Sequence, residues 1–182
     1  MTKKNYLNLK FRTADLSEAA ILAEVNRLAF AGHTPLIAPE FQAAWLANLE
    51  NRTPLFEELL RVGSTAFVAE ITDLEGITHI IATAILVPKG NPTPRFPEYG
   101  TWASIRWVSV HPDFGEQGLG RLIFEKCLTH ARETGEEAVV LHTSNIMRSA
   151  RHIYESLGFR ILRTETELFF GLQYWLFKLD LT

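Results

Sequence analysis

The sequence predicts an α+β domain of three layers, in which helices flank a central, mixed but mostly antiparallel sheet of about seven strands. Two observations lead to this prediction. Before residue 88, runs rich in Ile, Val, Thr and Phe follow one another as in an antiparallel hairpin. After residue 101 the pattern changes to strand, helix, strand, helix and strand, which is typical of a sheet covered by helices. The length of 182 residues fits one domain, so we expect residues 1–182 to form a single unit.

The first half should hold a short strand, two helical stretches and a hairpin. Asp15 and Glu18 have the spacing of a capping box, which starts a helix. Pro54 divides the second helical stretch, because proline cannot continue the hydrogen bonds of a helix interior. The apolar face expected for the first helix consists of Ile21, Val25, Leu28 and Ala29. The expected segments are a strand at 7–11, a helical stretch at 40–60, and hairpin strands at 64–71 and 77–87.

The second half begins with an irregular loop at residues 88–97, which holds four of the eight prolines. Beyond it, apolar runs predict strands and amphipathic stretches predict helices. Gly158 supplies a left-handed residue at which the last helix ends. The expected segments are strands at 102–110, 138–141, 160–166 and 174–181, and helices at 119–134 and 146–157.

Composition and charge exclude several classes of function. The net charge of -3 and a pI near 6.1 disfavour nucleic acid or an anionic membrane as a partner, because such partners select for excess Lys and Arg. No apolar run approaches the roughly 20 residues that cross a bilayer, and the N-terminus lacks the apolar stretch of a secretion signal. The single Cys127 forms no internal disulfide, and there is no CxxC pair for a metal. We expect a cytoplasmic protein without a metal, either monomeric or homodimeric.

The sharpest motif is a glycine-rich turn between an apolar strand and an amphipathic helix. Gly115, Gly118 and Gly120 lie within six residues. Glycine allows close approach of backbone amides to a ligand, and the first turn of a helix offers unpaired N–H groups that attract phosphate. The spacing G-x-x-G-x-G is neither that of a dinucleotide fold nor that of a P-loop. The turn therefore indicates a pyrophosphate held by main chain with Arg121 nearby, or else a glycine turn that binds no ligand.

Two segments together resemble the GNAT superfamily of acyl-CoA-dependent N-acetyltransferases: VSVHPDFGEQGLGR at residues 108–121 and ARHIYESLGF at 150–159. The resemblance implies that the first segment cradles the pyrophosphate of acetyl-CoA and that residues 101–159 form the acyl-CoA-binding core. It extends more loosely from Leu9 to Leu179. The cofactor-binding residues that it implies are Val108, Val110, Gly115, Glu116, Gln117, Gly118, Leu119, Gly120, Arg121, Asn145 and Tyr154.

The sequence departs from the family pattern at three positions. Gly115 replaces the usual Arg or Gln, and Glu116 replaces the usual Gly, which removes one side-chain contact to the pyrophosphate but leaves a backbone cradle possible. Met147 stands where many members carry an Asn that contacts the pantetheine arm. Asn145 either substitutes for that residue or serves only as the N-cap of the following helix.

The resemblance gives Tyr154 the role of general acid toward the departing CoA thiolate. A core aromatic is the alternative, because Tyr154 shares one helical face with Ala150, Ile153 and Leu157. The resemblance also implies that backbone groups near Val108 and Val110 pair with the pantetheine amides. One strand N–H there would stabilise the oxyanion.

The general base stays open. Many relatives place a glutamate on the strand at 102–110, where this sequence has Ser104 and Arg106 instead. His111, His142, Glu98 and a chain of water molecules are the alternatives. Cys127 as an acyl-carrying nucleophile is disfavoured by its place on the apolar face formed by Leu119, Ile123, Cys127 and Ala131.

We thus expect an N-acetyltransferase that transfers acetyl from acetyl-CoA to a primary amine of a small molecule, an amino acid or a peptide end. The amine would attack directly in a ternary complex. The acceptor pocket should come from residues 30–60, from 88–100 and from the last two strands, which hold aromatic residues but no acidic cluster. Two alternatives are a non-catalytic acyl-CoA-binding or sensor module, and a partner-binding domain without a CoA site.

Overall fold

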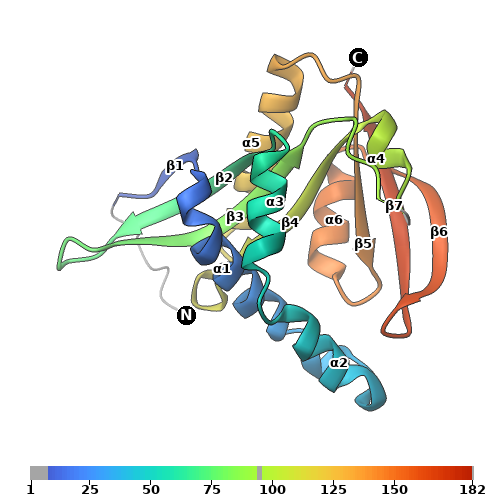
Figure 1. The fold of residues 1–182 in the computed structure, drawn as a ribbon, viewed down its shortest axis with the longest axis horizontal. Helices are drawn as coiled ribbons and strands as arrows, with labels where there is room; N and C mark the ends of the chain where they lie inside the picture. The colour runs from blue at the N-terminus through green and yellow to red at the C-terminus, as the bar shows by residue number, and fades with distance from the viewer. Residues whose placement is uncertain (1–7, 94–95, 182) are drawn as a thin grey trace.

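One sheet of seven strands runs through the protein (Figure 1). The computed structural model describes residues 8–93 and 96–181, with the side chains of 166–168 left out. The strand order is β1-β2-β3-β4-β5-β7-β6, and every neighbouring pair is antiparallel except β4 and β5. This confirms the mixed, mostly antiparallel sheet. The strands are β1 Lys10–Thr13, β2 Thr65–Thr72, β3 Thr78–Val87, β4 Ala103–Val110, β5 Ala138–Ser144, β6 Arg160–Phe169 and β7 Leu172–Asp180.

Helices cover both faces of the sheet, which gives the three layers that the sequence predicts (Figure 1). The helices are α1 Ala19–Ala31, α2 Pro39–Leu49, α3 Thr53–Arg61, α4 Glu98–Thr101, α5 Leu119–Glu133 and α6 Arg148–Ser156. Short 3-10 turns lie at Leu16–Glu18, Thr34–Leu36 and Pro112–Phe114. None of the described helices combines the length and the apolar character needed to cross a bilayer.

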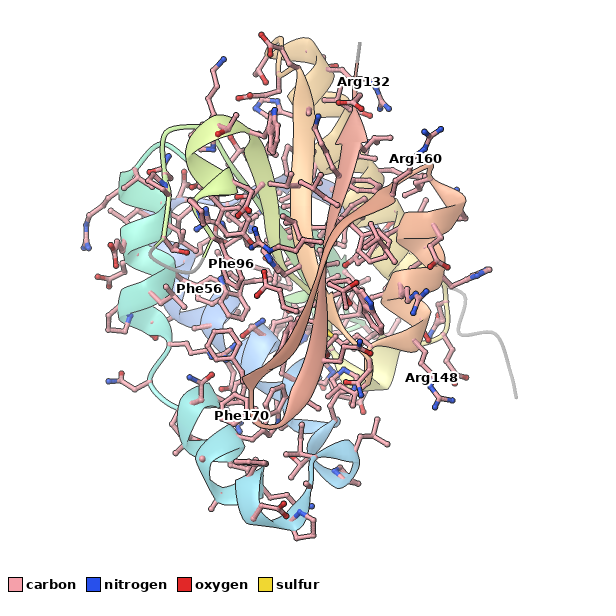
Figure 2. The ribbon with its side chains drawn as sticks, turned by 90° about the vertical axis from the view of Figure 1, so that its right-hand side faces the viewer. Phe56, Phe96, Arg132, Arg148, Arg160 and Phe170 are labelled. Carbon is pink, nitrogen blue, oxygen red and sulfur yellow. The ribbon has the colours of Figure 1, made fainter. Side chains whose placement is uncertain are left out.

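The two faces have separate hydrophobic cores. Ile123 and Phe124 of α5 are buried on one face together with Tyr154 of α6. On the other face Leu22 of α1 packs with Phe56 of α3. In Figure 2, Phe56, Phe96 and Phe170 lie on the side of the sheet where α2, α3 and α4 pack, whereas Arg148 and Arg160 project outward on the α6 side.

Most segment boundaries agree with the sequence prediction, and α5 ends one residue before the expected helix does. Pro54 does separate two helices, α2 and α3. The first strand is displaced, because β1 covers residues 10–13 and not 7–11, of which residue 7 lies outside the described residues. The capping box is present: the Asp15 N–H donates to Glu18 Oε2 at 2.9 Å, although the turn that it starts is the 3-10 turn before α1.

The predicted apolar face of the first helix is partly wrong. Ile21 is 43% exposed, whereas Leu22, Ala23 and Asn26 are buried beside Val25. Hydrophobic periodicity missed this face because Asn26 is polar. Its amide satisfies its hydrogen-bonding capacity inside the protein by donating to Ser109 Oγ at 2.9 Å, so burial is tolerated.

Candidate active site

The sheet opens between β4 and β5. These parallel strands pair only where Ala103 faces Val139 and Ser104 faces Val140, and from there the strands separate. Opposite β3, the strand β4 carries one extra residue, and Trp107 has a φ of 56°. Such a β-bulge bends a strand and increases its local twist. The edge of β4 toward β5 is therefore left without a strand partner over the part that contains Val108 and Val110.

The glycine turn lies directly beyond this open edge. A Cβ added to Gly120 would lie 3.6 Å from Val110 Cγ2, so the turn and the end of β4 are in contact. Gly118 precedes α5 with a φ of +79°, and a Cβ built there would meet nothing within 4 Å. The backbone amides of residues 116–121 donate to no residue that the structure describes. Together with the N-terminus of the 15-residue α5, these amides form a surface suited to an anion.

Two residues of the predicted cradle are engaged elsewhere. The Gly115 N–H donates to the Pro112 carbonyl at 3.2 Å, so this amide serves the turn itself. Arg121 Nε donates to Glu125 Oε1 at 2.8 Å, and its Nη1 donates to Ser156 Oγ at 2.9 Å, which ties α5 to α6. Leu119 is buried and anchors the first turn of α5.

The prediction that Asn145 is a helix N-cap is wrong. The residue before α6 is Met147, and Asn145 is exposed. Its N–H donates to the Gln173 carbonyl at 3.0 Å, so it continues the pairing of β5 with β7. The reason is that β5 runs to Ser144, three residues beyond its predicted end, and delays the start of the helix.

Tyr154 lies in the aromatic core between α5, α6 and the sheet. Its ring centroid is 4.9 Å from that of Phe124 and 6.1 Å from that of Phe159. Burial raises the pKa of its hydroxyl above the ordinary value, and the neighbouring Cys127 adds to the effect. The phenol is therefore protonated at neutral pH. The same burial raises the pKa of the Cys127 thiol, which is typical of an inert core cysteine.

The side chains considered as general bases all have partners of their own. His111 Nδ1 accepts from the Asp113 N–H at 3.3 Å, and Glu98 forms an ion pair with Arg163. His142 Nδ1 shares a hydrogen bond of 2.8 Å with the Tyr99 hydroxyl, and burial lowers the pKa of His142 to about 3. Each of these contacts fixes a loop or strand in place.

Ser104 and Arg106, at the positions where relatives carry a glutamate, bind to each other. Arg106 Nε donates to Ser104 Oγ at 2.8 Å, and the guanidinium lies 4.0 Å from the centroid of the Tyr99 ring. No carboxylate of the described side chains occupies this part of β4.

The structure also reveals a buried polar network that spacing in the sequence did not indicate. Arg52 Nη1 donates to Asn26 Oδ1 at 2.6 Å, and Asn26 Nδ2 donates to Ser109 Oγ at 2.9 Å. Ser109 Oγ in turn donates to the carbonyl of Trp107 at 3.1 Å. The network thus links α1 and the α2–α3 junction to the bulge of β4. A polar Asn26 within an apolar helix was the only hint.

An opened parallel strand pair, a bulge and a helix N-terminus whose amides have no described acceptor together make up the candidate site. The chain matches the acetyltransferase (GNAT) family over residues 32–159, and it belongs to that family. N-acetyltransferase 8B of Homo sapiens is 32% identical over 102 residues, which make up 56% of this chain and 41% of that protein. L-amino acid N-acyltransferase MnaT of Escherichia coli is 29% identical over 72 residues, 35% of this chain and 42% of that protein. The chain thus matches less than half the length of each relative.

Solved structures show the same fold at lower identity. YncA of Salmonella typhimurium, solved with its cofactor acetyl-CoA, superimposes with a TM-score of 0.69 at 21% identity, covering 97% of this chain and 95% of that one. PaiA N-acetyltransferase of Thermoplasma acidophilum, in complex with coenzyme A, also has a TM-score of 0.69, at 13% identity, covering 96% of this chain and 99% of that one.

Proposed function

We propose that this protein transfers an acetyl group from acetyl-CoA to a primary amine of a small molecule, an amino acid or a peptide end. The observation that carries the proposal is the contact between the open edge of β4 and the free amides at the start of α5. The two relatives and two neighbours named above support it, because their names describe N-acyl transfer or their structures contain acetyl-CoA or coenzyme A.

The residues between 101 and 159 would form the cofactor site. Amides of residues 116–121 and the positive end of the α5 dipole would hold the pyrophosphate, without a contribution from the Gly115 amide. Backbone groups of β4 at Val108 and Val110 would pair with the pantetheine arm. A strand N–H there would stabilise the negative charge that develops on the thioester carbonyl oxygen when the amine attacks the carbonyl carbon.

Proton transfer would use Tyr154 and water. The Tyr154 hydroxyl, kept protonated by burial, would donate to the departing thiolate. Glu98, His111 and His142 are each engaged through one atom. We assign the proton of the amine to water, with Glu98 Oε2 and His142 Nε2, which have no hydrogen-bond partner among the described residues, as the alternative acceptors. The amine would attack as the neutral species, because a protonated amine has no free electron pair.

Calorimetric titration of acetyl-CoA separates the proposal from a domain without a CoA site. The wild type should bind with micromolar affinity, and Gly118→Trp should lose binding because the indole fills the cradle. Gly76→Trp is the matched control, since Gly76 has a φ of +83°, also has nothing within 4 Å of an added Cβ, and lies in the β2–β3 turn. Absence of binding by the wild type would overturn the proposal.

Release of free CoA in the presence of amines separates an enzyme from a sensor module. A panel of amino acids, amino acid amides, dipeptides and simple amines is offered with acetyl-CoA, and thiol is measured with a chromogenic reagent. An amine-dependent rate above the hydrolysis rate is expected. Tight acetyl-CoA binding without such a rate would favour the non-catalytic alternative.

A further inference from the structure

Arg52 is a buried cation without a counter-ion. The residue is 7% exposed, and burial lowers the pKa of its guanidinium to about 10, so the group still carries its charge at neutral pH. Among the described side chains no carboxylate lies within ion-pair distance of it. A buried charge is expensive unless an opposite charge accompanies it. No described carboxylate offsets this charge, which only acceptor oxygens and aromatic faces surround.

The guanidinium has hydrogen-bond capacity to spare. Its Nε donates to the Asn48 carbonyl at 2.9 Å, Nη2 to Asn48 Oδ1 at 2.6 Å and Nη1 to Asn26 Oδ1 at 2.6 Å. Arginine has five N–H donors, so two of them, one on each Nη, have no partner among the described residues. Two N–H groups of a rigid planar fork match the two oxygens of a carboxylate.

A second buried donor in the same cluster lacks an acceptor. Trp45 is 3% exposed, and no described residue accepts a hydrogen bond from its Nε1. The Trp45 ring stacks on Phe30 with centroids 6.2 Å apart, and the Arg52 Cζ lies 5.7 Å from the centroid of the same Phe30 ring. Arg52 and Trp45 can only donate. Two Arg52 N–H groups and the Trp45 N–H thus have no acceptor among the described residues, and an anion could accept from them.

This cluster adjoins the bulge at which the acyl group would be held. Arg52 Cζ lies 4.5 Å from the centroid of the Trp107 ring, and the bonds through Asn26 and Ser109 end on the Trp107 carbonyl. It packs with the α1 and α3 face of the sheet, whereas α5 and its glycine turn pack on the opposite face. An anion at Arg52 is therefore not the pyrophosphate but belongs to a molecule that approaches from the other side.

Other arginines of the described residues have the carboxylate partners that Arg52 lacks. Arg12 pairs with Glu18 and Glu70, and Arg163 pairs with Glu98 and Glu165. Arg106 also has no carboxylate partner among the described side chains, and burial lowers the pKa of its guanidinium too, although its side chain is less completely covered than that of Arg52. If Arg52 only joined α2 to α3 through Asn48, its hydrogen-bond donors would be sufficient and its positive charge would not be needed.

We propose that Arg52 binds the carboxylate of the acetyl acceptor, which is therefore a free amino acid or a related amino-carboxylate with an apolar or aromatic side chain. The inference rests on the proposed function. In an α-amino acid the amine and the carboxylate share one carbon, so a carboxylate held at Arg52 places the amine beside Trp107. The partly exposed rings of Phe30 and Phe170, which pack on the buried Trp45, supply apolar surface for the side chain. Simple amines have no carboxylate, and the amine at the N-terminus of a peptide has no carboxylate on the neighbouring carbon.

Binding of acetylated products tests the inference without requiring turnover. The N-acetyl derivatives of glycine, methionine and phenylalanine, each as the acid and as the primary amide, are titrated calorimetrically into protein saturated with CoA. We expect at least one acid to bind about 10-fold to 100-fold more tightly than its amide, as for a charge-assisted pair. In Arg52→Gln the preference for the acid should disappear, and Arg52→Lys should restore part of it.

The matched control is Arg61→Gln, an exposed arginine at the other end of α3 that pairs only with Glu57. It should retain the preference. The inference is overturned if no acid binds more tightly than its amide, or if the preference survives in Arg52→Gln. Failure of the proposed function has a different signature, namely no CoA binding or no amine-dependent CoA release by the wild type. If CoA does not bind, the same acid and amide titrations on the free protein decide the role of Arg52.

Discussion

At the scale of single residues, burial sets the protonation state of the groups that matter most. Tyr154 and Cys127 are kept neutral in one core, and His142 is kept neutral on the other side of the sheet. In each case desolvation is the largest cause, since the charged form loses its hydration. Among the described residues, Arg52 alone keeps a charge at 7% exposure without a carboxylate partner. This contrast is the reason for proposing Arg52 as a ligand-binding group.

Tyr154→Phe tests the role of the phenol. The ring contacts with Phe124 and Phe159 remain, so the fold and the dissociation constant of acetyl-CoA should hardly change. Loss of a general acid should lower kcat by about 100-fold or more. Steady-state CoA release and calorimetry measure the two quantities. An unchanged kcat would mean that Tyr154 is a core aromatic and that another group protonates the thiolate.

His142 makes the stability of the protein depend on pH. In the folded state its pKa is about 3, whereas an unfolded histidine titrates near 6.5, so below that value only the unfolded chain takes up the proton. The free energy of unfolding should therefore fall as pH drops from about 6.5 toward 3, by at most about 1.4 kcal/mol per pH unit from this residue. Urea unfolding at several pH values measures the slope.

His142→Asn is the comparison for that slope, because its amide can still approach the Tyr99 hydroxyl but does not titrate. The variant should lose less stability between neutral and acid pH than the wild type. Equal slopes for the two proteins would show that the folded His142 takes up its proton as readily as the unfolded one.

At the scale of elements, two glycines at the junction of β4 and α5 differ in what their backbone conformation requires. Gly118 needs its left-handed φ of +79°, whereas no positive φ occurs at Gly120, which lies in the first turn of α5. Gly120 also has ordinary van der Waals room for a Cβ. Gly118 therefore has a conformational reason to be glycine, whereas the backbone at Gly120 would accept an alanine.

Alanine at these two positions should change stability in opposite directions. Gly118→Ala should lower the free energy of unfolding by about 1 kcal/mol, because an L residue is strained at positive φ. Gly120→Ala should raise it by about 0.5 kcal/mol, because alanine loses less backbone entropy than glycine in a helix. Chemical denaturation measures both values. A loss for Gly120→Ala as large as that for Gly118→Ala would contradict the assignment of conformations.

At the scale of the whole molecule, each face of the sheet carries one of the two proposed binding sites. The α5–α6 side carries the free amides, and the α1–α3 side carries the buried Arg52 network. Strands β4 and β5 diverge between the two. A ligand that reached through this opening would contact both cores and would stabilise the folded state as a whole.

Saturating acetyl-CoA should therefore raise the melting temperature. At a ligand concentration 100 times the dissociation constant the folded state gains about 2.7 kcal/mol, which shifts Tm by about 5–10 °C in a domain of this size. Differential scanning fluorimetry measures the shift. Gly118→Trp should show none, whereas Gly76→Trp should match the wild type, and equal shifts in both variants would place the ligand away from the glycine turn.

The sequence by itself determined the order of the elements, the glycine turn and the buried face of α5. These features depend on local chemistry, since periodicity, capping and glycine conformation act within a few residues. Even there, the extension of β5 to Ser144 by pairing with β7 displaced the start of α6 and overturned the N-cap assigned to Asn145.

Only the tertiary structure decided which charges are left unpaired. Asn26 and Ser109 are 83 positions apart, and Arg52 reaches Asn26 across 26 positions, so no spacing rule in the sequence connects them. The opening of β4 from β5 likewise follows from a bulge opposite β3. Packing brings these distant residues together and removes water from them, and an arginine becomes a candidate anion receptor only when that burial leaves it without a counter-ion.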